Sequence, residues 1–376
     1  MIPTGPFLDH VYSDLLNCCS RMKSQPNTPR IAVLGAGYWG VNHIRNYSEL
    51  GALEVVCDTN RASLDEISAR YPGIRIETDL SRVLAGDSID GVVIATPAVT
   101  HYSLARQAID AGKHVLVEKP LALNVDEGHH LVELADSRGV ILMVGHLLEY
   151  HPAVLRLAEL VKSGELGELR YIYSSRLNLG KVRREENILW SFAPHDIAII
   201  LRLTEEMPVR VSATGGAYLQ PEIADVTVTS LEFGSGIRAH IFVSWLHPYK
   251  EQRMVVIGSK RMAVFDDVRS EHKLVVYDQG VDFVDGRPIA RKNGGAPESI
   301  AAFEPLKRQS EVFLESITGS RKPITDGHSG LRVLKVLDAA ERSLGLAGFP
   351  ASLERDGDVA SLGGAPEAAS RLSEQL

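Results

Sequence analysis

Short runs of consecutive apolar residues alternate with longer amphipathic stretches between residues 30 and 145. The runs cover residues 31–34, 53–57, 91–95, 114–117 and 140–144. Strands that are apolar on both faces, separated by helices of about 10 to 15 residues, are typical of a parallel sheet that is covered on both sides. Because the crossovers in such sheets are right-handed, the pattern predicts a doubly wound α/β domain.

The pattern changes to a period of two beyond residue 168. Alternating apolar and polar positions predict strands at residues 168–174, 209–216, 224–233, 237–244, 254–258 and 273–277. Turn residues such as Gly234-Ser235-Gly236 separate them and indicate an open, mostly antiparallel sheet with one covered face. Helical periodicity follows at 300–318 and 328–345. The fold class is therefore α/β followed by α+β.

The chain divides into four parts on this pattern. Residues 1–29 form an N-terminal extension with four prolines and one possible helix near Leu8 to Cys19. Residues 30–148 form the doubly wound domain, and 149–346 form the α+β domain, whose last helices could pack back on the first domain. Residues 347–376, rich in Ala, Gly, Ser and Glu, read as a flexible tail.

The amino-acid composition limits the kinds of partner and the cell compartment that we expect for this protein. Of 376 residues, 44% are hydrophobic and 23% charged, with a net charge of −8, which argues against nucleic-acid and membrane partners because both favour a basic surface. No stretch reaches the ~18 consecutive apolar residues of a membrane span, and no apolar core of a signal peptide occurs in the first 30 residues. The three cysteines include no CxxC pair, so we expect a cytoplasmic protein without disulfides or a zinc site.

The strand at 31–34 leads directly into Gly35-Ala36-Gly37-Tyr38-Trp39-Gly40, and a helical pattern follows. This GxGxxG has the context that a dinucleotide-binding turn requires: Gly35 for the tight turn, Gly37 for close approach of a pyrophosphate, Gly40 for helix packing. The N–H groups of the turn and the helix N-terminus favour a phosphate. The alternative is a glycine-rich turn without a ligand.

The second strand ends at Asp58, about 20 positions beyond the glycines, where an acidic residue accepts hydrogen bonds from the adenosine ribose. A carboxylate here repels a 2′-phosphate and favours NAD over NADP, although Arg61 could soften the repulsion. Asp58 could also be the N-cap of the next helix.

Two later strand ends should line the same cleft, because ligands bind beyond the carboxyl ends of parallel strands. One carries Thr96 and Pro97, followed by His101, and the other carries Glu118 and Lys119 before Pro120. We interpret all five as cofactor contacts, together with Gly35, Gly37, Tyr38, Trp39, Gly40 and Asp58. Desolvation would lower the pKa of Lys119 and suit it to proton transfer. The alternative is a surface lysine paired with an acid.

A helix predicted from Ala193 onward places His195 in its first turn, where the helix dipole favours a neutral imidazole that can accept a substrate proton. A structural histidine is the alternative. Four cations occur within the nine residues of Arg176 to Arg184, and they could bind a diphosphate. The alternative is a solvated loop neutralised by Glu185 and Glu186. No metal-ligand spacing, GxSxG or Walker A pattern occurs.

The glycine turn, Thr96-Pro97, Glu118-Lys119-Pro120 and His195 together resemble the glucose–fructose oxidoreductase / inositol dehydrogenase / MocA family over residues 30 to 345. The resemblance implies an N-terminal NAD-binding Rossmann domain and a C-terminal α+β domain whose open sheet forms homodimers or homotetramers. It also implies a catalytic or substrate-orienting role for Lys119 and contact of His195 with the reacting hydroxyl.

Many family members have an aspartate four residues before the histidine, where this chain has Ser191. Serine does not titrate near neutral pH, so proton transfer falls to His195, Lys119 or water. The segment from Arg176 to Asp196 resembles the UDP-N-acetylglucosamine 3-dehydrogenase group. The resemblance implies a sugar-nucleotide substrate contacted by the side chains of Arg176, Asn178, Lys181, Ser191 and His195.

The resemblance thus implies NAD-dependent oxidation of a secondary hydroxyl, at C3 of a UDP-N-acetylhexosamine, to a ketone. Its product would serve amino-sugar synthesis for lipid A, a part of lipopolysaccharide, or for other glycans. Two alternatives remain open at this stage. One is a dehydrogenase of a free sugar, inositol or dihydrodiol, and the other is a non-catalytic NAD-binding regulator.

Overall fold

The computed structural model describes residues 28–86 and 88–353. The helix expected near Leu8, the cysteines at 18 and 19, and the tail from residue 354 onward lie outside the described residues. The beginning of the predicted tail is described, and there Ala351 is buried and forms a bridge with Val211 of the second sheet.

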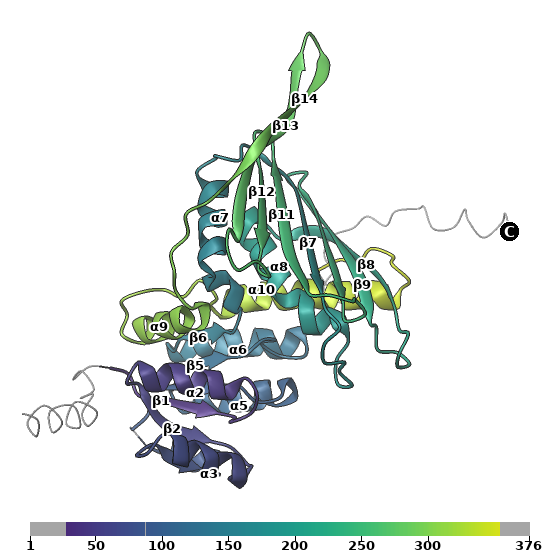
Figure 1. The fold of residues 1–376 in the computed structure, drawn as a ribbon. Helices are drawn as coiled ribbons and strands as arrows, with labels where there is room; N and C mark the ends of the chain where they lie inside the picture. Colours follow the sequence, from purple (N-terminus) through teal and green to yellow (C-terminus); the bar gives the residue numbers. More distant parts are fainter. Residues whose placement is uncertain (1–27, 87, 354–376) are drawn as a thin grey trace, which may run out of the picture.

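The first domain is built on a six-stranded, fully parallel sheet with strand order β3-β2-β1-β4-β5-β6 (Figure 1). Its strands are β1 (Ile31–Leu34), β2 (Leu53–Cys57), β3 (Arg75–Glu77), β4 (Gly91–Ile94), β5 (His114–Val117) and β6 (Leu142–Val144). Five correspond to the predicted apolar runs. The pattern missed β3 because this edge strand has three residues, none of them buried.

Helices cover both faces of this sheet, as the doubly wound pattern predicts. The helices are α2 (Gly40–Glu49), α3 (Arg61–Arg70), α4 (Leu80–Leu84), α5 (His101–Asp110) and α6 (Val125–Arg138), with a 3₁₀ turn η1 (Ala98–Thr100). The buried side chains of α2 and α3 share one core with Val312 and Phe313 of a much later helix, α9 (Pro305–Ile317). The last part of the chain therefore returns to complete the first domain's core.

The second sheet has eight strands in the order β14-β13-β12-β11-β7-β10-β9-β8. They are β7 (Leu169–Leu177), β8 (Pro208–Gly216), β9 (Val226–Phe233), β10 (Arg238–Ser244), β11 (Glu251–Gly258), β12 (Met262–Asp266), β13 (Leu274–Val284) and β14 (Arg287–Pro297). The sheet is antiparallel except for the central pair of β7 and β10, which is parallel. β12 and β14 were not predicted, and β14 has no buried residue that could produce an alternating pattern.

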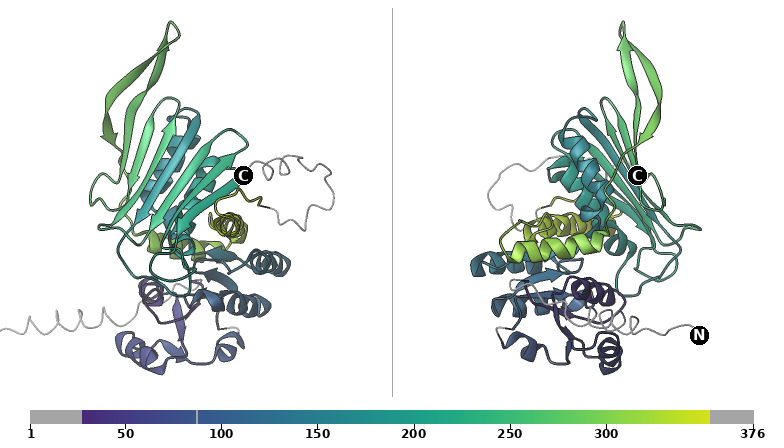
Figure 2. Two further views of the ribbon diagram at one scale, coloured as in Figure 1. Left: turned by 90° about the vertical axis from the view of Figure 1, so that its right-hand side faces the viewer. Right: turned by 60° about the vertical axis from the view of Figure 1, so that its left-hand side comes forward.

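Three helices cover one face of the second sheet: α7 (Pro152–Lys162), α8 (Ile188–Thr204) and α10 (Gly327–Gly345). The 3₁₀ turn η2 (Leu147–Tyr150) joins β6 to α7. Figure 2 shows that, within the described part of the chain, no helix covers the opposite face, and that the β13–β14 hairpin extends beyond the sheet. α10 also contacts α6 and β6, so it packs against both domains.

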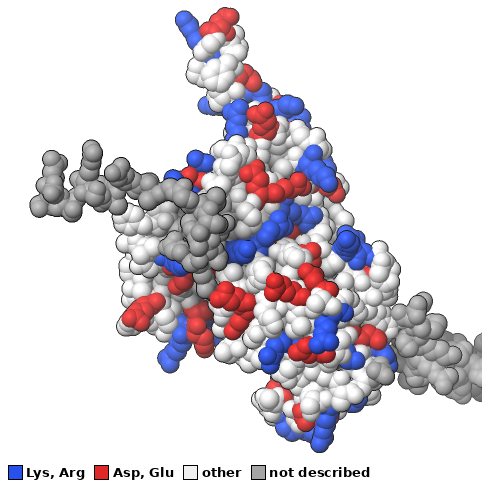
Figure 3. Space-filling view, turned by 180° about the vertical axis from the view of Figure 1, so that it is seen from behind, with Lys and Arg blue, Asp and Glu red and all other residues white. Residues whose placement is uncertain are grey.

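The surface carries charges of both signs. On the face drawn in Figure 3, acidic and basic side chains are interspersed rather than gathered by sign. Among the described helices, none combines the length and the apolar character that a membrane crossing requires.

Candidate active site

The turn between β1 and α2 has the steric properties of a phosphate-binding turn. Gly35 has a φ of +95°, and a Cβ there would lie 2.7 Å from the carbonyl oxygen of Ala95. A Cβ on Gly40 would collide with the carbonyl oxygen of Gly35. A Cβ on Gly37 would meet nothing within 4 Å, so the backbone there faces open space. Two glycines are therefore required by packing, and the third leaves room for a pyrophosphate.

Asp58 lies directly after β2 and is bonded to this turn. Its Oδ2 accepts a hydrogen bond from the backbone N–H of Ala36 at 2.6 Å, and its Oδ1 accepts one from Asn60 at 2.8 Å. The suggestion that Asp58 caps the next helix is wrong: Asn60 is the N-cap of α3 and accepts from Ala62 and Ser63. Arg61 is paired with Asp65 at 2.9 Å, so its charge is directed to a residue other than Asp58.

His101 connects the two other strand ends that face the turn. Its Nδ1 lies 2.7 Å from the carbonyl oxygen of Pro120, and its Nε2 lies 3.0 Å from that of Thr96. Burial lowers the pKa of His101, although these hydrogen bonds oppose the shift. The buried ring therefore lies between the Thr96-Pro97 segment and the Lys119-Pro120 segment, close to a carbonyl oxygen of each.

Glu118 is buried between the glycine turn and β6. Its Oε1 accepts hydrogen bonds from Trp39 Nε1 at 2.5 Å and from His43 Nε2 at 2.8 Å. Burial acts to raise the pKa of Glu118, but the hydrogen bonds from His43 and Trp39, together with the charges of His43 and Lys119, hold the pKa below its ordinary value. Trp39 and Glu118, both predicted as cofactor contacts, are thus bonded to each other.

Lys119 reaches from the first domain to the second. Its Nζ donates a hydrogen bond to the backbone carbonyl of Ser191 in α8 at 3.1 Å. Burial lowers the pKa of Lys119, while the carboxylates of Glu186 and Glu118 act in the opposite direction. The lysine is therefore neither a solvated surface residue nor fixed in an ion pair, and its amine is easier to deprotonate than a free one.

α8 begins earlier than the sequence suggested. Asn187 is its N-cap, accepting from the N–H of Trp190, so His195 lies in the helix interior and not in the first turn. The predicted dipole effect is therefore wrong. Burial, then the charges of Lys119 and Arg176 and the neighbouring His146, hold the pKa of His195 well below its ordinary value. The imidazole is neutral, as expected, for a different reason.

His146 is a site residue that the sequence analysis did not single out. It follows β6 as Lys119 follows β5, so the rule on strand ends could have found it. Its ring contacts that of His195 edge-on, with the centroids 6.3 Å apart. Burial lowers the pKa of His146 to about 4. The Nδ1 atoms of both rings are buried and have no hydrogen-bond partner among the described residues.

The charged segment after His146 and α7 has two parts. Arg176 is the penultimate residue of β7, not part of a loop, and forms a buried ion pair with Asp196 of α8 at 2.7 Å. Lys181 is exposed, and Asn178 follows the strand with its N–H bonded to the carbonyl of Ser244. Arg183 is paired with Glu186 at 3.0 Å. Lys181 is thus exposed to solvent, whereas Arg176 is buried and held by Asp196.

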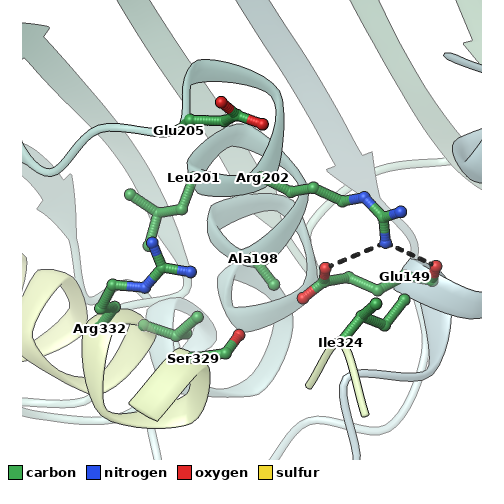
Figure 4. A pocket seen from close by; sticks show the side chains of 9 residues that line it. Glu149, Ala198, Leu201, Arg202, Glu205, Ile324, Ser329 and Arg332 are labelled. Carbon is green, nitrogen blue, oxygen red and sulfur yellow. Dashed lines mark hydrogen bonds and ion pairs between the residues drawn. The ribbon is translucent and has the colours of Figure 1, made fainter. Parts of the chain in front are cut away.

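A cavity of about 270 Å³ lies at the other end of α8 (Figure 4). Arg202 of α8 donates to the carbonyl of Glu149 in η2 at 3.3 Å and approaches its carboxylate to 3.5 Å. Burial raises the pKa of Glu149 to about 7, although Arg202 opposes the shift. This contact ties the segment that follows His146 to the helix that carries His195.

Both parts of the chain match family models. Residues 29–146 match the model described as an oxidoreductase family with an NAD-binding Rossmann fold, and residues 154–264 match the GFO/IDH/MocA C-terminal domain. The UDP-N-acetylglucosamine 3-dehydrogenase of Acidithiobacillus ferrooxidans is 30% identical over 306 residues, which are 81% of this chain and 94% of that protein. The chain belongs to the GFO/IDH/MocA oxidoreductase family.

Other comparisons agree on the fold and leave the substrate open. A solved structure of the same Acidithiobacillus enzyme superposes with a TM-score of 0.75 at 28% identity, covering 87% of this chain and 99% of that one. The scyllo-inositol 2-dehydrogenase (NAD(+)) of Bacillus subtilis is 28% identical over 269 residues, 68% of this chain and 78% of that protein.

The predicted fold class, family and NAD cofactor are thus confirmed. The chain is an NAD-dependent oxidoreductase, and the alternative of a non-catalytic regulator is wrong. The glycine turn and Asp58 fit the cofactor, because Gly37 leaves space at the turn and the carboxylate stands beside it. Tyr38, 91% exposed, is the side chain of the turn most open to a ligand.

Proposed function

We propose that this oxidoreductase oxidises a secondary hydroxyl, at C3, of a UDP-N-acetylhexosamine to a ketone. The observation that carries the proposal is the bond from Lys119 Nζ to the carbonyl of Ser191, one helical turn before His195. It joins the candidate base of one domain to α8, the helix of the other domain that carries the candidate hydroxyl-binding residue. The relative with 30% identity, whose name specifies UDP-N-acetylglucosamine and position 3, supports the choice of substrate.

Bound NAD⁺ supplies the hydride acceptor in this reaction. The backbone of Gly35 to Gly40 would hold its pyrophosphate and Asp58 its ribose, and Thr96 and Pro97 follow β4, the strand beside β1. Lys119 Nζ then accepts the hydroxyl proton as the C–H bond delivers its hydride. A lowered pKa favours this role, because a general base works best near the operating pH.

His195 orients the hydroxyl in this scheme. Because its pKa lies well below the ordinary value, it is neutral and offers a lone pair, but it is a weaker base than Lys119. Its buried, unpartnered Nδ1 and that of His146 have hydrogen-bonding capacity left for a substrate. Ser191 contributes its backbone carbonyl, and Lys181 and Asn178 stand where they can meet the nucleotide's phosphates.

The substrate is tested by following NADH absorbance at 340 nm with NAD⁺ and a panel of substrates. We expect turnover with UDP-N-acetylglucosamine or its 6-carboxylate and none with glucose or myo-inositol. Mass spectrometry after trapping should place the ketone at C3, where an amination step can consume it. Turnover with myo-inositol alone would show that the substrate is a free polyol and not a sugar nucleotide. No NADH with any member of the panel would overturn the proposal.

The uncovered face of the second sheet supports assembly into a homodimer or homotetramer. Tyr171, Tyr173 and His240 form an aromatic cluster on it, with the rings of Tyr173 and His240 stacked at 5.3 Å. Phe283 on the β13–β14 hairpin is 71% exposed. Exposed apolar surface of this kind marks protein–protein contacts. Light scattering should give a dimer or tetramer, and Tyr173→Glu should shift it towards monomer; a monomeric wild type would refute the assembly.

A further inference from the structure

Glu118 is a buried carboxylate in the first domain that the proposed reaction does not use. Only 8% of the residue is exposed, and it lies directly between β5 and Lys119. Taking a carboxylate out of water costs several kcal/mol unless good hydrogen bonds compensate, and an amide or apolar residue avoids that cost. We therefore expect the buried carboxylate of Glu118 to have a function that an amide or an apolar side chain could not perform.

The two side chains that bond to Glu118 both belong to the dinucleotide-binding element. Trp39 is the residue before Gly40 in the glycine turn, and His43 lies in the first turn of α2. Both reach the same oxygen, Oε1, at 2.5 and 2.8 Å. The turn and helix that would hold a pyrophosphate are thus bonded to one carboxylate, whose own backbone continues into Lys119.

The other oxygen of Glu118 faces the remaining parts of the site. Oε2 lies 3.3 Å from the backbone N–H of Lys119. A Cβ on Gly145 would lie 2.8 Å from Oε2, so glycine is required there for β6 to pack against the carboxylate. The next residue is His146. The negative charge of Glu118 also opposes the lowering of the pKa of Lys119, His146 and His101.

We propose that Glu118 is a positioning residue that locks the phosphate-binding turn, through Trp39 and His43, to the strand end that carries Lys119. Cofactor affinity and the placement of the lysine then depend on the same carboxylate. The inference rests on the proposed function, in which Lys119 acts at the reacting centre, but its cofactor-binding part stands without any sugar substrate.

Glu118→Gln and Trp39→Phe test the proposal. The glutamine keeps the shape and one acceptor oxygen but removes the charge, and the phenylalanine removes only the indole N–H. By isothermal titration calorimetry we expect the Kd for NADH to rise about tenfold in Glu118→Gln and about threefold in Trp39→Phe, since His43 remains bonded in the latter. Because Trp39 acts through Oε1 of Glu118, the loss of affinity in the double variant should be smaller than the sum of the two single losses. Glu66→Gln, an exposed carboxylate of α3, is the matched control and should match wild type.

The pH profile separates positioning from mere structural support. Removing the charge of Glu118 lowers the pKa of Lys119 further, so the rising limb of kcat/KM should move to lower pH in Glu118→Gln and stay in place in Trp39→Phe. Unchanged NADH affinity in both variants would contradict the positioning role of Glu118. Additive losses of NADH affinity in the double variant would contradict it as well. If no sugar nucleotide reacts, the proposed function fails, but the calorimetry with NADH still tests the role of Glu118. If Glu118→Gln does not fold, Trp39→Phe tests that role instead, because it keeps the carboxylate paired with His43.

Discussion

The two sides of the candidate site are organised differently. On the dinucleotide side, the functional geometry is contained in short segments: three glycines within six residues, and one carboxylate that bonds the N–H of Ala36. On the substrate side, each functional group depends on a partner from another element, such as Asp196 for Arg176 and Ser191 for Lys119. A local motif can specify a cofactor site, whereas a substrate site built between domains needs the whole fold.

Lys119 follows a strand of the dinucleotide-binding domain but acts on the substrate. Its removal should therefore separate the effect on catalysis from the effect on cofactor binding. We expect Lys119→Ala to lower kcat about 10³-fold, the typical contribution of a positioned general base, and to change the Kd for NADH only a few fold. Steady-state kinetics and NADH titration measure both. Lys162→Ala, an exposed lysine of α7, serves as the control. Retained turnover would show that another group takes the proton.

The ion pairs of the two sides should differ in their effect on stability. Asp196→Asn leaves the guanidinium of Arg176 buried without its partner, and the free energy of unfolding should fall by about 4 kcal/mol. Asp90→Asn removes the partly exposed pair with Arg30 at the N-terminal ends of the central strands β1 and β4, where a loss below about 1 kcal/mol is expected. Chemical denaturation compares them, and equal losses would contradict the distinction.

Glu149 lies where the two sides join. The effect of its side chain on the free energy of unfolding should depend on pH. The folded chain holds the pKa of Glu149 at about 7, above the ordinary 4.5, so ionising it costs stability as pH rises from 4.5 to about 7. Glutamine mimics the protonated form. The stability of Glu149→Gln relative to wild type should therefore increase across this window, by up to about 3 kcal/mol, as measured by denaturation at several pH values. A difference that is constant with pH would refute the shift.

Lys181 should give the smallest effect on the substrate side. It is exposed, so solvent screens its interaction with a diphosphate, and we expect Lys181→Ala to raise KM about threefold with kcat unchanged. The effect should shrink further at high salt. A salt-independent loss, or a fall in kcat, would place this lysine nearer to the reacting atoms than we propose.

The sequence predicted the first side well and the second in part. The five apolar runs, the glycines, Asp58 and the Lys119 strand end are local features whose spacing carries the signal. The start of α8 was misplaced because Pro194 resembles the first residue of a helix, whereas Asn187 caps it seven residues earlier. The outer half of β13 and the whole of β14 were missed, because their residues are exposed or half-buried on both faces and show no alternation.

The sequence by itself determined the class of cofactor and the order of the elements, because glycine sterics and hydrophobic period act over a few neighbouring residues. Only the tertiary structure decided the partners of the charged groups: Glu118 with Trp39 and His43, Arg176 with Asp196, Lys119 with α8. Burial sets the proton affinities of His146 and His195, and burial is a property of packing between segments that lie far apart in the chain.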